Sequence, residues 1–188
     1  MSGKPSGELP KAIDELIEHW GRQTPPPVHQ WHPTEARDID MRIVKNGDWL
    51  YQGTPINRPR LVQLFASVLR VEEDGSTWLV TPGEKLRIEV EDAHFQAVIL
   101  DVEEQHHQPV LVFTTNIGER VVADADHLID VQYPFDDDTP VPYLHVRDGL
   151  IARVSRSVFI ALANRAEIRG DVAGVLSAGV FMPLGPAE

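Results

Sequence analysis

The stretch DMRIVKNGDWLYQGTPI, residues 40–56, decides the fold that we expect for this chain of 188 residues. Apolar residues flank an Asn46-Gly47 pair, and this dipeptide is the strongest short signal for a β-hairpin turn. Asn57 then offers a side-chain cap for a helix, and Pro59 falls in the first helical turn, where a missing N–H costs little. The apolar face of that helix is predicted to consist of Leu61, Leu64, Phe65 and Val68.

The stretch YLHVRDGLIARVSR, residues 143–156, repeats this order. Residues 44–47 line up with residues 146–149, and residues 56–58 line up with residues 154–156. Two copies about 100 residues apart indicate a duplication and not a solenoid, although such units are common enough for the match to arise by chance. We expect an α+β fold whose core is a duplicated hairpin–helix–strand unit.

The chain is predicted to divide into three parts. Residues 1–29 have apolar residues at helical spacing followed by TPPPV, which predicts an amphipathic helix and a proline linker. Residues 30–82 are expected to form the first α+β repeat domain. Residues 83–188 are expected to form a β-rich C-terminal domain with the second repeat, because alternating stretches such as LRIEVE predict an antiparallel meander before it.

The charge of the chain limits its partners. Asp and Glu outnumber Lys and Arg by 29 to 17, which gives a formal net charge of −12 and a pI near 5.0. Binding to nucleic acid or to an anionic membrane needs a basic footprint. We therefore expect no nucleic-acid partner and no membrane insertion, whereas local basic residues still permit an anionic small molecule.

The absence of cysteine removes disulfides, thiolate catalysis and thiolate metal sites. Residues 1–20 lack a continuous apolar segment of the length that a signal peptide needs, and no run of about 18 apolar residues follows. These features predict a cytoplasmic protein.

No motif in the chain names a reaction. The TPGEK stretch, residues 81–85, lacks the second glycine and the following helix of a phosphate-binding loop. It is either an ordinary turn or a place where Lys85 contacts a phosphate as a point charge. The eight histidines show no metal-ligand spacing, and no serine lies in a nucleophile elbow. We expect no catalytic residue, no metal and no cofactor, and an enzyme is the less favoured class.

Several basic residues occupy special positions in the two copies. Arg58 and Arg156 follow the predicted helix caps, and Lys45 and Arg147 flank the equivalent hairpin turns. Because a helix start favours anions, an arginine there either pairs with a nearby carboxylate or helps to bind an anion. The sequence leaves both readings open.

Five motifs carry a family resemblance: WHP (residues 31–33), GDWLYQGTPINR (47–58), LVTPGEKLRIEVED (79–92), TTNIG (114–118) and PYLHVRDGLIARVSR (142–156). Together they resemble the proteobacterial domain-of-unknown-function family numbered 1285 over residues 30–165, with Gly83 in place of an aliphatic residue. The resemblance implies an α+β fold with a duplicated core and a C-terminal part similar to a pleckstrin-homology domain. It also implies a role in signal transduction and a nucleotide-like ligand between two domains, without an established activity.

We expect a non-catalytic binding or signalling protein that holds an anionic, nucleotide-like ligand between its two domains. Lys and Arg would contact phosphate, Tyr143 would stack on a base, and Asn116 would read a polar edge. The alternative is a protein–protein interaction scaffold without a small-molecule ligand, which the acidic composition and the meander also suit. The predicted ligand-binding residues are Thr81, Glu84, Lys85, Thr115, Asn116, Tyr143, Arg147 and Arg156.

Overall fold

The computed structural model describes residues 26–134 and 139–187. The helix predicted near the N-terminus therefore lies outside the described residues. Contacts divide the chain between Glu91 and Asp92 into two compact units, and each unit is described by itself. The first unit extends past the predicted boundary at residue 82, because the strand that follows this residue belongs to the first sheet.

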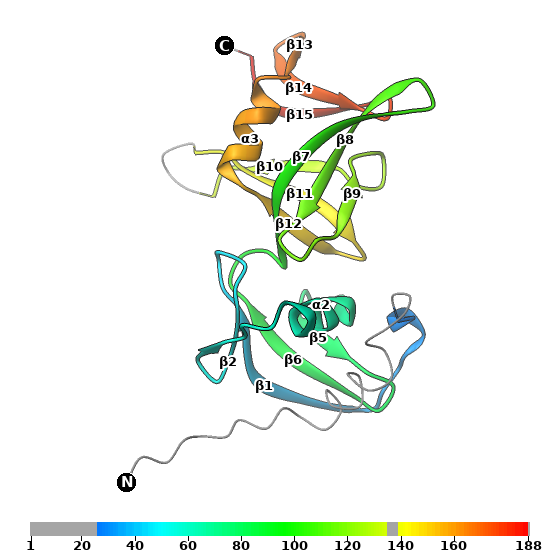
Figure 1. Ribbon diagram of the computed structural model, residues 1–188, viewed down its shortest axis with the longest axis vertical. Coiled ribbons are helices and arrows are strands. Elements are labelled where there is room, and N and C mark those ends of the chain that lie inside the picture. Colours follow the sequence, from blue (N-terminus) through cyan, green and yellow to red (C-terminus); the bar gives the residue numbers. More distant parts are fainter. Residues whose placement is uncertain (1–25, 135–138, 188) are drawn as a thin grey trace. The chain divides into compact units, whose positions relative to one another are not determined.

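The first unit is built on a six-stranded sheet (Figure 1). The predicted hairpin at Asn46-Gly47 is confirmed, and Gly47 has the positive φ of +89° that a glycine adopts without steric cost. The strands in spatial order are β3 (Thr54–Pro55), β2 (Trp49–Tyr51), β1 (Glu35–Ile43), β6 (Glu84–Val90), β5 (Thr77–Val80) and β4 (Leu69–Val71).

The core of the first unit lies between this sheet and helix α2 (Pro59–Ser67). Pro59 begins the helix as predicted, but the N-cap is Arg58 and not Asn57, and no side chain caps the first turn. Phe65 is fully buried against Trp49, with 5.9 Å between the ring centroids. The alternation predicted for β6 is confirmed, because Leu86 and Ile88 are buried while Arg87 and Glu89 are exposed. A short helix, η1 (Val28–Gln30), precedes the sheet.

The second unit contains another six-stranded sheet. The turn predicted at Asp148-Gly149 is confirmed, a second hairpin turns at His106-His107, and all four residues have positive φ. The strands in spatial order are β10 (Ile129–Gln132), β11 (Val141–Arg147), β12 (Leu150–Val154), β7 (Phe95–Gln105), β8 (Gln108–Thr115) and β9 (Arg120–Val122).

Helix α3 (Arg156–Ala163) follows β12 directly. The Ser155 side chain accepts a hydrogen bond from the Val158 N–H, which is the N-cap that the repeat predicted. The backbone N–H of Ser155 donates to the Ala97 carbonyl at 3.0 Å, and this bond is the last one between the β12 segment and β7. β12 therefore stops pairing with β7 where α3 begins.

A three-stranded sheet follows α3, formed by β13 (Glu167–Arg169), β14 (Val172–Ser177) and β15 (Val180–Pro186). Gly174 is required here, because a Cβ at this position would lie 2.5 Å from the Phe181 ring. Fully buried Ser177 joins this sheet to the larger one. Its hydroxyl accepts from the Leu111 N–H at 2.8 Å and donates to the Ala123 carbonyl at 2.6 Å. The hydroxyl therefore bridges these two backbone groups in place of a direct backbone hydrogen bond.

The predicted α+β class with a duplicated core is wrong. Strands make up 52% of the described residues and helices only 13%. The strands that follow α2 join the same sheet as the preceding hairpin, whereas those that follow α3 form a separate sheet, so the two copies are not the same unit. The pleckstrin-homology likeness fails similarly, because three further strands follow the helix and because β7 and β12 run parallel. Local hairpin and cap signals were correct, but they do not encode which strands pair across the chain.

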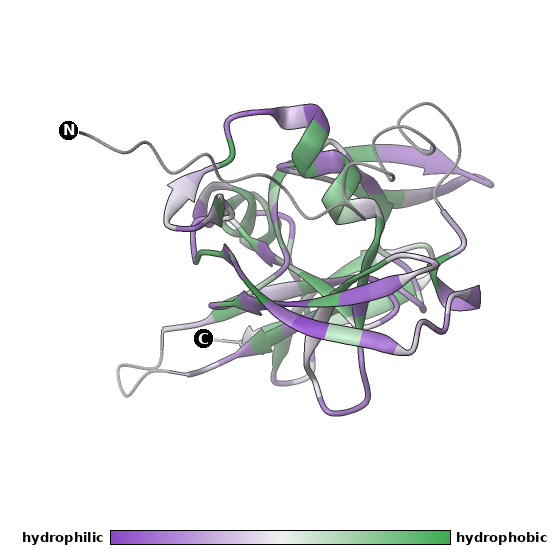
Figure 2. Ribbon diagram, turned by 90° about the horizontal axis from the view of Figure 1, so that it is seen from below, coloured by the Kyte–Doolittle hydropathy of each residue, from purple (hydrophilic) through white to green (hydrophobic). Residues whose placement is uncertain are grey.

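Figure 2 shows hydrophobic segments within the strands and helices and hydrophilic residues in many loops and strand ends. Of the helices in the described ranges, none is long and apolar enough to cross a membrane.

We expect Ser177→Ala to lower the free energy of unfolding by about 2 kcal/mol, because it leaves a buried N–H and a buried carbonyl without a partner. The matched control is Ser157→Ala, which removes an exposed hydroxyl whose contact is the Ser155 hydroxyl. The control should change stability by less than about 0.5 kcal/mol. Urea unfolding of both variants measures the difference, and equal losses would contradict the structural role of Ser177.

Candidate functional site

Three of the predicted ligand-binding residues lie in the turn between β5 and β6. The Thr81 hydroxyl is buried, accepts from the Glu84 N–H at 3.0 Å and donates to the Glu84 carbonyl at 2.9 Å. The Glu84 carboxylate binds the Arg37 guanidinium with both oxygens, at 2.9 and 3.2 Å. This turn is therefore closed by its own threonine, and its glutamate fastens β1 to β6.

Lys85 lies on β6, directly after this turn. Its Nζ is 3.1 Å from the Glu72 carboxylate and 4.5 Å from the centre of the Trp78 ring. Arg70 also binds Glu72, at 2.6 Å, and donates to the Trp31 carbonyl at 2.7 Å. The Arg70 hydrogen bond, with a further contribution from Lys85, lowers the pKa of Glu72. The ammonium of Lys85 thus belongs to an ion-pair network that holds the segment after η1 against β4.

The other predicted residues lie in the second unit, and three of them fix the turn between β8 and β9. The Thr115 hydroxyl accepts from the Glu119 N–H at 3.1 Å. Asn116 and Gln96 exchange two hydrogen bonds, one through the Asn116 side-chain oxygen and one through its backbone N–H. Arg147 binds Glu119 at 3.2 Å and lies 5.5 Å from the centre of the Phe95 ring.

Tyr143 belongs to a hydrogen-bonded network at the start of the second unit. Its hydroxyl donates to Asp92 at 2.6 Å, and Arg153 binds the other Asp92 oxygen at 2.6 Å. Tyr143 and Arg153 are direct partners across β11 and β12, so the sheet register sets the geometry of all three groups. Burial and the hydrogen bond to Asp92 raise the pKa of Tyr143 to about 12. The ring also packs in a small apolar cluster with Ala93 and Val141.

Arg156 differs from the other predicted residues. It is exposed at the first position of α3 and makes no ion pair within the described ranges. The remaining seven residues have hydrogen bonds or ion pairs inside their own unit, three of them in the first unit and four in the second. For Arg147 this agrees with the alternative that the basic residue pairs with a carboxylate, and Lys85 also pairs with a carboxylate, that of Glu72. That the eight residues bind one ligand stays a prediction.

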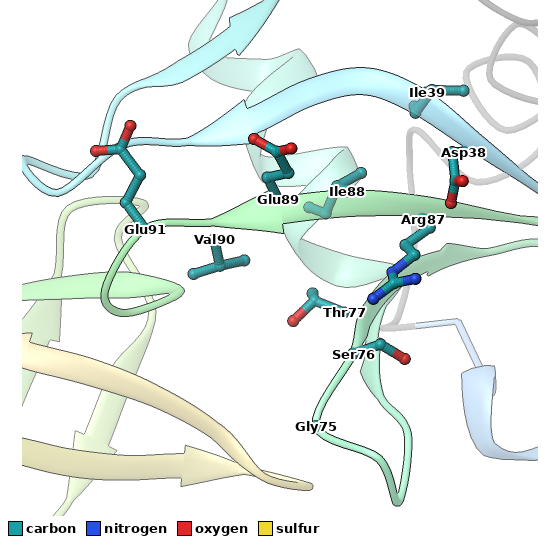
Figure 3. A pocket seen from close by; sticks show the side chains of 10 residues that line it. All are labelled: Asp38, Ile39, Gly75, Ser76, Thr77, Arg87, Ile88, Glu89, Val90 and Glu91. Carbon is teal, nitrogen blue, oxygen red and sulfur yellow. The ribbon is translucent and has the colours of Figure 1, made fainter.

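A polar groove of about 580 Å³ lies on the first unit, where the pairing of β1 and β6 is irregular between Asp38 and Arg42. Figure 3 shows Asp38 beside Arg87, and shows Glu89 and Glu91 pointing away from the turn at Gly75. Arg42 lies 3.6 Å from Glu89 and 3.7 Å from Glu91. This groove could not be predicted from the sequence, because an irregular pairing of distant strands has no local signature.

The charges of the groove disfavour an anionic ligand. Its lining contains three carboxylates but the guanidinium of Arg87 alone among basic side chains. Glu91 is also occupied, because it accepts the Lys45 backbone N–H at 2.9 Å. Within the described ranges, no group of three or more His, Asp or Glu side chains is placed to hold a metal ion.

The second unit exposes an unpaired strand edge. β7 pairs with β12 only from Phe95 to Ala97, whereas it pairs with β8 as far as Gln105. Residues 98–104, which we call the β7 strip, therefore have β8 on one side and no described strand on the other. The figure of the whole chain shows β7 and β8 as a long hairpin (Figure 1).

The direction of the backbone groups in the β7 strip follows from its partner. Leu111 directs its N–H to Ser177, and Pro109 directs its carbonyl to the Ala178 N–H, so both point away from β7. In an antiparallel pair, the backbone N–H and C=O groups of two opposite residues either bond to each other or all point away from the partner strand. Val102 and Glu104, opposite Leu111 and Pro109, thus direct N–H and C=O to the open side.

The β7 strip also carries apolar side chains. Val98 is 41% exposed, Ile99 is 50% exposed and Val102 is 49% exposed. Monomeric proteins normally blunt an exposed edge with charge and keep apolar groups away from it. An antiparallel meander was expected in this part of the chain, and the edge was not predicted, because the early end of β12 is not visible in the β7 residues themselves.

His94 is a buried neutral histidine beside this sheet, with 8% of its surface exposed. The Ile151 N–H donates to its Nδ1 at 3.2 Å, and the His94 backbone N–H donates to the Ile151 carbonyl at 3.1 Å. Burial, and secondarily the charge of Arg147, lower the pKa of His94 to about 4. The side chain therefore acts as a structural acceptor.

Comparisons with known proteins support a single family. The model described as the N-terminal domain of a domain of unknown function, DUF1285, matches residues 26–93, and the model of the DUF1285 C-terminal domain matches residues 94–184. A search of curated proteins found no match.

Two solved structures are similar. A DUF1285 family protein from Silicibacter pomeroyi DSS-3 is 42% identical, with 93% of this chain and 94% of that chain covered and a TM-score of 0.83. A DUF1285 family protein from Shewanella baltica OS155 is 31% identical, with 67% of this chain and 91% of that chain covered and a TM-score of 0.54. The family assignment made from the sequence motifs is confirmed.

The lowered pKa of His94 predicts how stability depends on pH. Between about pH 6.5 and about pH 4 the unfolded chain binds a proton at His94 that the folded chain excludes, so stability falls as the pH falls. The total loss from this group should approach about 3 kcal/mol. His94→Gln should remove this part of the pH dependence, and His145→Gln, at an exposed position, should retain it. Urea unfolding across this range provides the test, and parallel pH profiles for wild type and His94→Gln would contradict the prediction.

Proposed function

We propose, from the premise that the chain belongs to the DUF1285 family, that it is a non-catalytic protein-interaction module. The observation that carries the proposal is the β7 strip, where exposed apolar side chains lie beside an unpaired backbone edge. This proposal takes the alternative expected from the sequence, a protein–protein interaction scaffold, and assigns its binding surface to the β7 strip.

The surface supports a protein partner better than a small molecule. An edge strand offers a row of backbone donors and acceptors to another chain, and neighbouring apolar side chains add burial on contact. A small ligand usually binds in a concave site that removes most of its surface from water. The β7 strip belongs to a two-stranded hairpin segment, which suits an extended chain.

The expected anionic ligand remains the alternative to this proposal. Seven of its eight predicted contacts already take part in bonds within their units, so binding would compete with those bonds. The groove on the first unit has a surplus of carboxylates, which raises the electrostatic cost of a phosphate there.

The proposal has two finer parts. We place the module in the cytoplasm, where a chain without cysteine loses nothing by forgoing disulfides. We also assign it to signal transduction, the role that the family resemblance implies, because an interaction module without catalytic residues acts through the partners that it brings together.

Photo-crosslinking in the native host tests the proposal. A photoreactive benzoylphenylalanine replaces Ile99 in the β7 strip, and a control chain carries it at Ile168, which is 65% exposed on β13. We expect a protein adduct from position 99 and none from position 168. The partner, identified by mass spectrometry and purified, should bind wild type about tenfold more tightly than Ile99→Asp.

Two results would contradict the proposal. One is the absence of an adduct from position 99, or equal adducts from both positions. The other is a thermal-shift experiment in which nucleotides stabilise wild type, but not a Lys85→Ala and Arg147→Ala double variant. That second result would favour the anionic-ligand alternative.

A further inference from the structure

The β7 strip is more selective than an ordinary open edge. Asp101 and Glu104 lie on opposite faces of the strand and have no Lys or Arg partner within the described ranges. The Glu103 carboxylate is already paired with Arg120. The strip therefore presents two carboxylates without a Lys or Arg partner, of which Glu104 lies 3.6 Å from the His107 ring, among apolar side chains, and this combination restricts which chain can lie against it.

A second copy of this chain is a poor occupant. Antiparallel self-pairing through the open side would bring Asp101 or Glu103 opposite a carboxylate in each register that joins more than one pair of the outward residues Leu100, Val102 and Glu104. Like charges directly opposite each other destabilise a sheet. The net charge of −12 adds a general repulsion between copies.

The acidic residues alone would have a simpler explanation, because charged side chains protect strand edges from aggregation. That explanation does not account for the exposed Val98, Ile99 and Val102 between them. Apolar side chains weaken such protection, whereas they strengthen binding to a chain of matching pattern. Acidic side chains that repel a second copy and attract a cationic segment, beside apolar side chains that strengthen binding to that segment, account for both features.

We infer that the β7 strip binds a cationic, extended segment of a partner protein, which adds as an antiparallel strand to its open edge. The inference rests on the proposed function and names the chemistry of the partner. Backbone bonds form to Leu100, Val102 and Glu104, whose N–H and C=O groups face the open side.

The spacing of the strip defines the recognised pattern. A basic residue lies opposite Glu104 and another opposite Asp101, and apolar residues lie opposite Val102 and Ile99. Read from the N-terminus of the partner, this is a basic residue, any residue, an apolar residue, and the same triplet once more. An acetylated and amidated peptide, Lys-Thr-Val-Lys-Thr-Val, reproduces it.

Backbone NMR of the isotope-labelled full-length protein, titrated with this peptide, tests the inference. We expect saturable shifts and slower hydrogen exchange at the amides of Leu100, Val102 and Glu104. The charge-reversed peptide Glu-Thr-Val-Glu-Thr-Val should bind about tenfold more weakly, because two attractive cross-strand pairs become repulsive. A peptide with proline in place of its first valine should also bind more weakly, because it lacks the N–H that would donate to Val102.

Protein variants separate the two contributions to binding. Val102→Pro removes the central outward N–H and should abolish binding, while it spares the bonds between β7 and β8 because this N–H does not take part in them. Asp101→Asn combined with Glu104→Gln keeps the backbone intact and should remove the preference for the lysine peptide. The matched control is Asp130→Asn, at an exposed position of β10, which should leave binding unchanged.

The outcomes distinguish this inference from the proposed function. Equal binding of the two charged peptides, shifts away from the strip, or no binding would overturn the inference. If adducts still form from position 99 in any of these cases, the proposed function stands and the partner binds by another chemistry. If those adducts are also absent, both the inference and the proposed function are contradicted.

Discussion

The second unit depends on one local constraint, the helix cap at Ser155. Its backbone N–H makes the last bond between the β12 segment and β7, to Ala97, and its hydroxyl then accepts the Val158 N–H that begins α3. A residue that caps a helix cannot continue a strand, so β12 ends while β7 runs on for eight further residues beside β8. Because the cap removes one neighbour and the β8 ladder retains the other, the β7 strip is held extended with no described strand on its other side, although α3 also contacts β7.

The polar side chains serve the fold more than a ligand site. Thr81 closes a turn, Glu84 fastens β1 to β6, and Asp92 joins two strands through Tyr143 and Arg153. Each of these groups has a partner whose loss would leave a partly buried donor or acceptor unsatisfied. Side-chain chemistry is thus largely used within each unit, and the accessible recognition chemistry of the second unit lies in backbone groups and apolar side chains.

Signals that act over a few residues could be read correctly from the sequence. The turns at Asn46-Gly47 and Asp148-Gly149, the cap at Ser155 and the alternation of β6 are all set by neighbours in the chain. The α+β class was wrong because it assumed that two similar hairpin–helix segments continue alike. The parallel pairing of β12 with β7, and hence the open edge, depends on contacts between distant segments, which the residues of either strand do not encode locally. The polar candidates were chosen by residue type, which does not reveal that Lys85 faces Glu72 or that Arg147 faces Glu119.

Amide hydrogen exchange of the free protein tests the central claim, that the β7 strip has one bonded side and one open side. In this account Asp101 and Glu103 donate to β8 and exchange slowly, whereas Leu100 and Val102, which alternate with them, face the open side and exchange quickly. Residue-resolved NMR should show this alternation under native conditions. Uniform protection of all four amides would contradict the account, because it would mean that the open side is already paired.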